Sequence, residues 1–245
     1  MSVNASGGGG RGKGLLLALA AVVVIAAIAV VASMTLLKSE PPDLATNAPS
    51  IPGLAPGAKV AAVVAPPSGV FHYTVGKGSK AKYVAREQLA VVPVPNETSG
   101  ETADITGDLY LTRDGKPGDQ KSAFKVDLRT LRSDQSLRDR AIVGTLALDK
   151  FPFASFTLES VEGFPPNYVE GREIELTLKG ALTIRETTKP VTWKAFARRA
   201  GEYLTAIADT DVKMTDYGIT PPVVSVSRVE DGVHLQITLI GKLGN

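Results

Sequence analysis

Residues 173–185 alternate apolar and polar side chains with a period of two, and this pattern constrains the fold more than any other feature of the chain. Successive side chains of a β-strand point to opposite faces of its sheet, so the alternation predicts a strand with one apolar face and one polar face. The apolar face holds Ile174, Leu176, Leu178, Leu182 and Ile184. Shorter stretches with the same period lie at 71–75 and 233–239.

Turn residues separate these alternating stretches. Asp114-Gly115 lies between 105–112 and 123–128, and Asp231-Gly232 lies between 223–229 and 233–240. Asp-Gly pairs favour tight hairpin turns. Long one-sided strands joined by such turns suit a closed ring, because closure removes exposed strand edges. We therefore predict that residues 70–245 form an all-β domain, an antiparallel eight-stranded barrel.

Residues 133–143 depart from the period of two. Ser133 is a residue type that caps helices, and Leu137, Ala141 and Ile142 follow it at helical spacing. The domain is therefore predicted to contain one short helix of two or three turns.

Residues 15–37 are a run of 23 residues without a charged side chain. As a helix this run would be about 34 Å long, against about 30 Å for the hydrocarbon core of a bilayer. Arg11 and Lys13 precede it, which places the N-terminus in the cytoplasm by the positive-inside rule. We predict a basic, glycine-rich cytoplasmic tail at 1–14 and a single transmembrane signal anchor at 15–37. A cleaved signal peptide is the alternative, and either one exports the rest of the chain.

Residues 38–69 contain seven prolines among alanine, glycine and serine. Proline interrupts the hydrogen-bond ladders of helices and sheets, so this segment is predicted to be a semi-extended tether. The barrel domain is accordingly expected outside the cytoplasm, held at the cell membrane.

The composition excludes several kinds of site. The chain has no cysteine, which excludes disulfides, thiolate metal sites and a cysteine nucleophile. From residue 70 onward basic and acidic residues are equal in number, so no basic surface for nucleic acid is expected. A G-x-G-x-x-A pattern at 76–81 is followed by the proline-broken stretch 91–95 and not by a helix, so a turn between strands is the better interpretation. No G-x-S-x-G motif is present.

Only two histidines, His72 and His234, are present, so a three-histidine metal site is excluded. They lie in the first and last predicted strands, which are neighbours if the barrel closes. A two-histidine surface metal site is therefore an alternative to two solvated side chains. Because both alternate with apolar residues, we favour the solvated interpretation and predict no metal and no cofactor.

Several motifs resemble the YceI-like family, in the same order and at similar spacing from Phe71 to Leu243. They comprise Phe124–Asp134, Leu137-Arg-Asp139, Phe151-Pro152 with Ala154-Ser-Phe156, Gly180-Ala-Leu-Thr-Ile184 with Thr188-Lys-Pro-Val191, and Asp216-Tyr-Gly-Ile219. The resemblance implies a lipocalin-like barrel, exported to the periplasm or cell surface, whose apolar pocket binds a polyisoprenoid or another amphipathic lipid. Two departures stand out: the glycine of the family hairpin is replaced at Arg185-Glu186, and Met214 stands where arginine is common.

The candidate site is the apolar inner face of the barrel. Its predicted lining is Phe71, Tyr73, Ile174, Leu176, Leu178, Leu182, Ile184, Leu235 and Ile237. Small residues on the same face, such as Gly180, Ala195 and Ala197, leave space for a ligand or suit a tapered, filled barrel equally well.

Two functions therefore remain open. The first is a membrane-tethered module that binds a lipid, with no catalytic residues. The alternative is a filled-barrel scaffold or stress-response accessory that acts through a protein partner. An enzyme acting on a quinone-like isoprenoid is disfavoured because no catalytic motif is present, and a homodimer is considered for the assembly.

Overall fold

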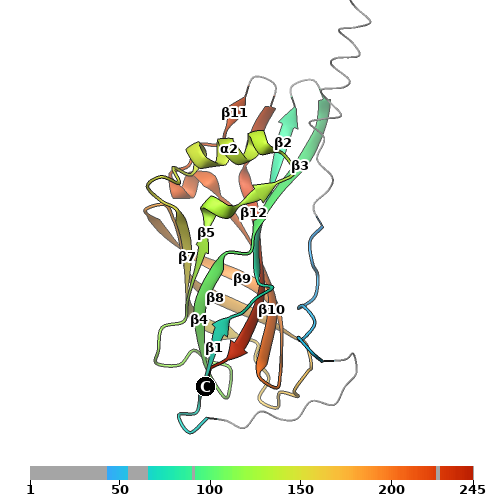
Figure 1. Cartoon of the computed structure of the whole chain (residues 1–245), viewed down its shortest axis with the longest axis vertical. Coiled ribbons are helices and arrows are strands. Elements are labelled where there is room, and N and C mark those ends of the chain that lie inside the picture. The colour runs from blue at the N-terminus through green and yellow to red at the C-terminus, as the bar shows by residue number, and fades with distance from the viewer. Residues whose placement is uncertain (1–42, 55–65, 90–91, 225–226, 245) are drawn as a thin grey trace, which may run out of the picture. The chain divides into compact units, whose positions relative to one another are not determined.

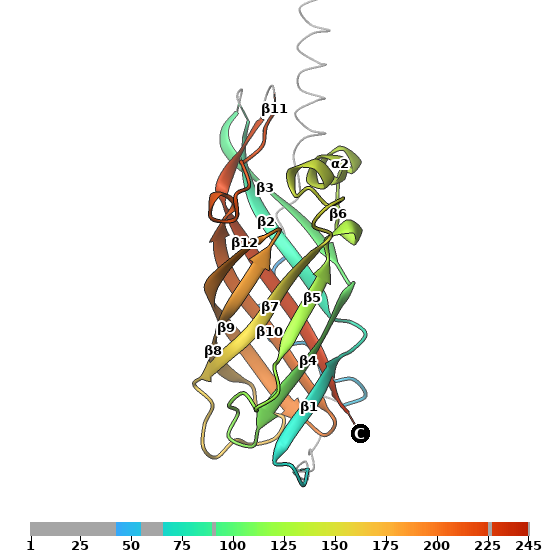
Figure 2. The ribbon, with the colours of Figure 1, turned by 90° about the vertical axis from the view of Figure 1, so that its left-hand side faces the viewer.

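Antiparallel strands wrap around a common axis and form a closed barrel (Figure 1, Figure 2). The computed structural model describes residues 43–54, 66–89, 92–224 and 227–244. The strands in chain order are β1 (Val70–Val75), β2 (Lys80–Leu89), β3 (Val92–Thr102), β4 (Ile105–Thr112), β5 (Ala123–Asp127), β6 (Arg132–Ser133), β7 (Phe153–Glu162), β8 (Ile174–Ile184), β9 (Thr187–Ala200), β10 (Tyr203–Lys213), β11 (Val223–Val224) and β12 (Ser227–Leu243).

Strand β12 closes the ring. It pairs with β10 on one side, where Leu204 is opposite Gly241. On the other side it pairs with both β1 and β2, where Tyr73 is opposite Leu243 and Tyr83 is opposite Leu235. The strands β1 and β2 thus form one wall, interrupted by the turn at 76–79 that the glycines predicted.

The next two walls are interrupted in the same way. Strand β3 pairs with β2 and β4 pairs with β1, so β3 and β4 form one wall. The following wall consists of β5, paired with β4, and β6, paired with β3. With β7, β8, β9, β10 and β12, the described strands make eight walls, and the predicted antiparallel eight-stranded barrel is confirmed.

The predicted short helix is present as α2 (Ser136–Thr145), which begins three residues after Ser133. It lies at the end of the barrel that also holds β11, here called the helical end, while the C-terminus lies at the opposite end (Figure 1). The side chain of Ser133 does not cap the helix: its hydroxyl donates to Asp139 Oδ1 over 2.7 Å. Leu137 is 73% exposed, so an apolar face does not hold α2 in place.

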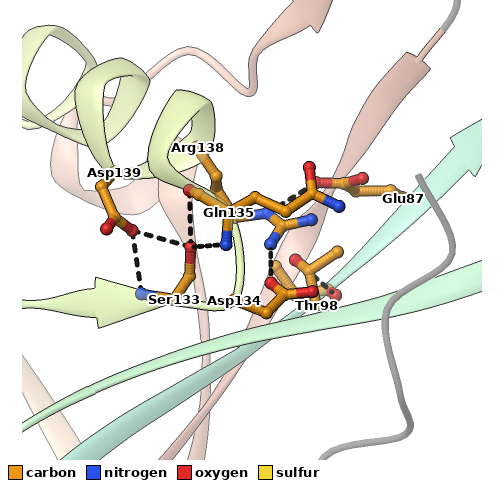
Figure 3. Close-up of polar contacts among 8 residues, drawn as sticks. Glu87, Thr98, Ser133, Asp134, Gln135, Arg138 and Asp139 are labelled. Atoms are coloured by element: carbon orange, nitrogen blue, oxygen red, sulfur yellow. Dashed lines mark hydrogen bonds and ion pairs between the residues drawn. The ribbon is translucent and has the colours of Figure 1, made fainter. Parts of the chain in front are cut away.

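Charged side chains fix α2 to the barrel (Figure 3). Arg138 points from the helix to Glu87 of β2, with Nε 3.4 Å from Oε1, and it also pairs with Asp134. The arginine and Glu87 side chains are only 12% and 16% exposed. The Arg-Asp dipeptide at 138–139 therefore has a structural role: Arg138 pairs with the barrel wall, and Asp139 accepts hydrogen bonds from Ser133 in the strand before the helix.

The described residues form two apolar clusters in the interior. The larger one extends through the half of the barrel that lies opposite the helical end, near the C-terminus, and this half is called the C-terminal half below. It includes Phe71, Tyr73, Leu176 and Trp193. The smaller one lies toward the helical end, where Leu182 packs with Tyr217 and Ile219. The latter two residues belong to the motif at 216–219, which spans the end of a 3-10 helix, η2 (Met214–Tyr217).

Part of the predicted tether lies along the outer wall. Ala45 and the side chain of Gln236 exchange two hydrogen bonds of 3.1 and 3.0 Å. The backbone N–H of Ala48 donates to Glu173, and its carbonyl accepts from Arg198. Ala48 and Ile51 are 5% and 6% exposed. Residues 43–54, here called the strap, therefore pack on the barrel without pairing as a strand.

The predicted anchor at 15–37 lies outside the described residues. Among the residues that are described, there is no helix of the length and apolar character needed to cross a membrane.

Candidate functional site

An apolar cavity of about 90 Å³ lies in the C-terminal half of the barrel. Each of the eight walls contributes to its lining, so the cavity exists only because the ring is closed. Its lining residues are Tyr73, Leu109, Leu111, Thr112, Gly115, Phe124, Phe156, Leu158, Val161, Phe164, Tyr168, Ile174, Leu176, Leu178, Ala195, Ala197, Arg198, Arg199, Leu204, Ala206 and Leu239. The walls present almost entirely carbon to this space, so its interior favours hydrocarbon over water.

Small residues on β9 and β10 open this space. Ala195, Ala197 and Ala206 all line the cavity, and Ala195 is opposite Leu176 of β8. Bulky residues close it toward the helical end, where the rings of Phe156 and Trp193 meet edge to face at 5.8 Å. The space is thus bounded by aromatic packing at its inner end.

Polar groups gather at the outer end of the cavity, which is the C-terminal end of the barrel. The guanidinium of Arg199 lies 4.6 Å from the ring centre of Phe71 and 5.4 Å from that of Tyr168. It donates to Oε1 of Glu170 through Nε and Nη2, over 2.9 and 2.7 Å. The Tyr168 hydroxyl accepts from the backbone N–H of Arg199 over 2.7 Å. This set, Arg199 with Glu170, Tyr168 and Tyr73, is called the polar end below.

Tyr73 is the most buried member of the polar end, at 2% exposure. Its hydroxyl has no hydrogen-bond partner among the described residues. Burial raises the pKa of Tyr73 to about 12, although the nearby positive charge of Arg199 opposes the rise. The phenol therefore stays protonated, and able to donate, at neutral pH.

Alkaline solution is expected to destabilise the barrel. Burial raises the pKa of both Tyr73 and Tyr217 to about 12, whereas unfolded tyrosine ionises near pH 10. The stability that these groups contribute is complete below pH 10 and is lost as the pH rises toward 12. We expect the free energy of unfolding to have fallen by on the order of 1 kcal/mol per tyrosine at pH 11. Urea unfolding at pH 8 and pH 11 measures this, and a difference that persists unchanged in a Tyr73→Phe/Tyr217→Phe double variant would contradict it.

The structure distributes the nine predicted lining residues over three places. Four of them line the cavity: Tyr73, Ile174, Leu176 and Leu178. Phe71 belongs to the larger cluster and lies beneath Arg199, and Leu235 and Ile237 pack against that cluster. Leu182 and Ile184 belong to the smaller cluster at the helical end. All nine thus point inward, but only four of them contact the space itself.

Other lining residues lie outside the predicted set. Phe164 and Tyr168 lie on the connection between β7 and β8, and Arg198 and Arg199 lie near the end of β9. The consecutive arginines at the end of an alternating stretch were a visible signal, because one of two consecutive strand residues must face inward. Nothing in the sequence indicated that a loop would bring Tyr168 and Glu170 to that arginine.

The two histidines do not approach each other. His72 pairs with Asp108 on β4 over 2.7 Å. His234 lies between Asp209 and Asp211 of β10, at 3.1 and 2.9 Å. Roughly ten residues of extended chain, about 33 Å, separate the corresponding positions along β12. Among the described residues there is no cluster that could hold a metal ion.

The solved structures that are similar in fold to this chain include the following two. BcnA of Burkholderia cenocepacia is 17% identical with a TM-score of 0.51, covering 66% of this chain and 95% of its own. A polyisoprenoid binding domain from Saccharophagus degradans, implicated in plant cell wall breakdown, is 10% identical with a TM-score of 0.52, covering 71% of this chain and 98% of its own. No curated protein matches the sequence.

The sequence itself matches a family model over most of the barrel. The model describes the YceI-like domain, and its match spans residues 75–240, from the end of β1 to near the end of β12. The barrel, the motifs along it and this match agree, and the chain belongs to the YceI-like family.

Proposed function

We propose that this protein is a membrane-tethered lipid-binding module that holds a polyisoprenoid or a similar amphipathic lipid in its barrel, without catalysis. The observation that carries the proposal is the apolar cavity to which all eight walls contribute. Burying hydrocarbon there would contribute about 25 cal/mol for each Å² removed from water. The fold similarity to a structure described as a polyisoprenoid binding domain supports the same class of ligand.

The size of the cavity defines how such a ligand would be held. A space of about 90 Å³ accommodates a short segment of a long isoprenoid chain. The rest of the chain would follow the barrel axis toward Trp193 and Phe156, or leave through the polar end. Binding would therefore require side chains around the cavity to change rotamers.

The predicted membrane anchor completes the proposal. A barrel attached to the membrane by residues 15–37 would stay close to the bilayer, which is the source of such lipids. The domain would then lie on the extracytoplasmic side, because basic residues precede the apolar run.

A filled-barrel scaffold that acts through a protein partner is the second candidate. The small cavity volume favours it, since pockets for small molecules are typically about 300–1,000 Å³. The two candidates differ in one observable: whether the purified protein contains a stoichiometric lipid.

Native mass spectrometry of the full chain, purified from carbonate-washed membranes, tests the proposal. We expect a discrete adduct that solvent extraction identifies as an isoprenoid or acyl lipid. A matched variant that fills the cavity, Ala195→Phe, separates lipid held in the barrel from lipid held by the anchor. If the wild-type protein has no lipid adduct, or if the adduct persists in Ala195→Phe, the scaffold function is favoured. If the carbonate wash releases the protein from the membranes, the predicted anchor is contradicted.

A further inference from the structure

The Tyr73 hydroxyl is a buried donor without a partner, and it belongs to a residue that lines the cavity. Three other buried hydroxyls without a partner occur among the described residues, on Tyr83, Thr205 and Tyr217. None of these three residues lines the cavity. An unsatisfied buried hydroxyl costs stability, so its persistence at a ligand site calls for an explanation.

The charged side chains around Tyr73 are already paired, although Glu170 Oε2 and Arg198 Nε are buried without a hydrogen-bond partner among the described residues. Arg199 is bonded to Glu170 through two nitrogens, and its two neighbouring aromatic rings restrict access to it. Arg198 borders the cavity, but its guanidinium faces the strap on the outer wall and pairs there with Glu173 over 2.8 Å. A phosphate or carboxylate that entered here would have to displace a protein carboxylate from the arginine that binds it. The incoming anion would then lie close to the displaced carboxylate. The polar end is therefore poorly suited to an anion, because the carboxylates would repel it.

The same group suits a neutral oxygen. A hydroxyl or carbonyl oxygen has lone pairs that can accept the hydrogen bond from the Tyr73 phenol. Such an oxygen also brings no charge into a region where burying a charge is costly. The carbon-lined space next to Tyr73 would receive the first part of the hydrocarbon chain. The hydrogen bond would thus form at the boundary between the polar end and the cavity.

We propose that the polar end selects lipids with an uncharged oxygen-bearing head, such as an isoprenoid alcohol, and that Tyr73 donates the hydrogen bond that recognises this oxygen. This inference rests on the proposed lipid-binding function. It adds a head-group selectivity, which excludes isoprenoid diphosphates and fatty-acid anions as preferred ligands.

A competition experiment on the full chain tests it. The detergent-solubilised protein is mixed with equal amounts of geranylgeraniol, the hydrocarbon of equal chain length without the hydroxyl, and geranylgeranyl diphosphate. Native mass spectrometry then compares the three adducts. We expect the alcohol to exceed both others by fivefold or more, and Tyr73→Phe to reduce the ratio of alcohol to hydrocarbon to about one. The hydrocarbon adduct itself should not decrease in this variant.

Tyr83→Phe is the matched control. It removes another buried hydroxyl without a partner, on a residue outside the cavity lining, and should leave the ratio of alcohol to hydrocarbon unchanged. Thermal unfolding of both variants verifies that the barrel is intact.

The two levels of the proposal fail differently. A preference for the alcohol that Tyr73→Phe leaves intact, or a preference for the diphosphate, would overturn the role of the polar end while lipid binding stands. The absence of all three adducts from the wild-type chain would overturn the lipid-binding function itself.

Discussion

Ala195→Phe is expected to reduce lipid binding to the barrel at least tenfold, a loss of about 1.4 kcal/mol or more in binding free energy. Ala195 is 1% exposed and lines the cavity from β9, opposite Leu176. A phenyl ring at this position would occupy the space that the ligand needs. Overpacking should lower the free energy of unfolding by about 1–3 kcal/mol, which leaves the protein folded. The measurement is the stoichiometry of the lipid adduct in the purified protein.

Lys194→Phe is the control for this prediction. Lys194 is the neighbouring residue on β9, and its side chain is exposed on the opposite face of the strand. It introduces the same ring without entering the cavity, so binding should remain within about twofold of the wild type. Equal binding by both variants would show that the cavity is not where the lipid is held.

Gly180→Ala is expected to lower the free energy of unfolding by about 3 kcal/mol, near the upper end of overpacking effects. A Cβ at this position would lie 2.1 Å from the carbonyl oxygen of Thr157 and 2.7 Å from the ring of Phe156. The backbone of β7 cannot move away without losing its pairing with β8. Gly180 is opposite Leu158, where the register of these two strands is irregular. The single tryptophan, Trp193, is buried and gives a fluorescence signal for urea unfolding.

Gly144→Ala provides the opposite case. Gly144 lies in α2, and a Cβ there would meet no heavy atom within 4 Å. Alanine is the better helix former by up to about 1 kcal/mol, so this variant should be as stable as the wild type or more stable. If Gly180→Ala were equally harmless, the close approach of β7 and β8 would not be a real constraint.

The barrel could be predicted because its signals are local. The alternation at 173–185 became β8, and Asp114-Gly115 fell between the paired strands β4 and β5. The turn predicted at Asp231-Gly232 is wrong, because both residues lie inside β12, where its register with β2 shifts between Val229 and Val233. The interruptions of three walls could not be predicted in the same way. Whether β1 continues into β2 as one wall depends on both pairing with β12, which is more than 130 residues away in the chain.

For the strap, the proline content predicted the absence of strand pairing but not the contacts with the barrel. The prolines indicated that residues 38–69 would not join a ladder, and residues 43–54 do not pair as a strand. They bind instead through side chains of the barrel, such as Gln236 and Arg198. Such contacts join residues far apart in sequence and leave no periodic pattern.

The sequence predicted which face of the strands forms the candidate site, but not where along the barrel the cavity lies. Alternation identifies which side chains point inward, and Leu176 and Leu182 have the same period. It does not show that Leu176 borders a cavity while Leu182 packs against Tyr217, because that difference depends on volumes contributed by other strands. The polar end escaped prediction for a similar reason: Glu170 lies on a loop and reaches Arg199 only in the folded barrel.

The hairpin at Arg185 explains one departure from the family motif. Arg185 has a φ of 57°, in the left-handed region that glycine adopts without strain. Its side chain is engaged, since Nη1 donates to the carbonyl of Gly218 over 2.8 Å and the guanidinium lies 5.6 Å from the ring centre of Phe151. These contacts offset the backbone strain that replacing the glycine introduces.

The position of β12 in the ring also determines when the barrel can form during synthesis. Strand β12 is the last in the chain, yet β10, β1 and β2 all depend on it for a partner. Until residues 227–243 have left the ribosome, those strands have open edges that can pair with other chains. The nascent chain must therefore pass through a long interval in which it is vulnerable to aggregation, and closure of the barrel depends on contacts between its first and last strands.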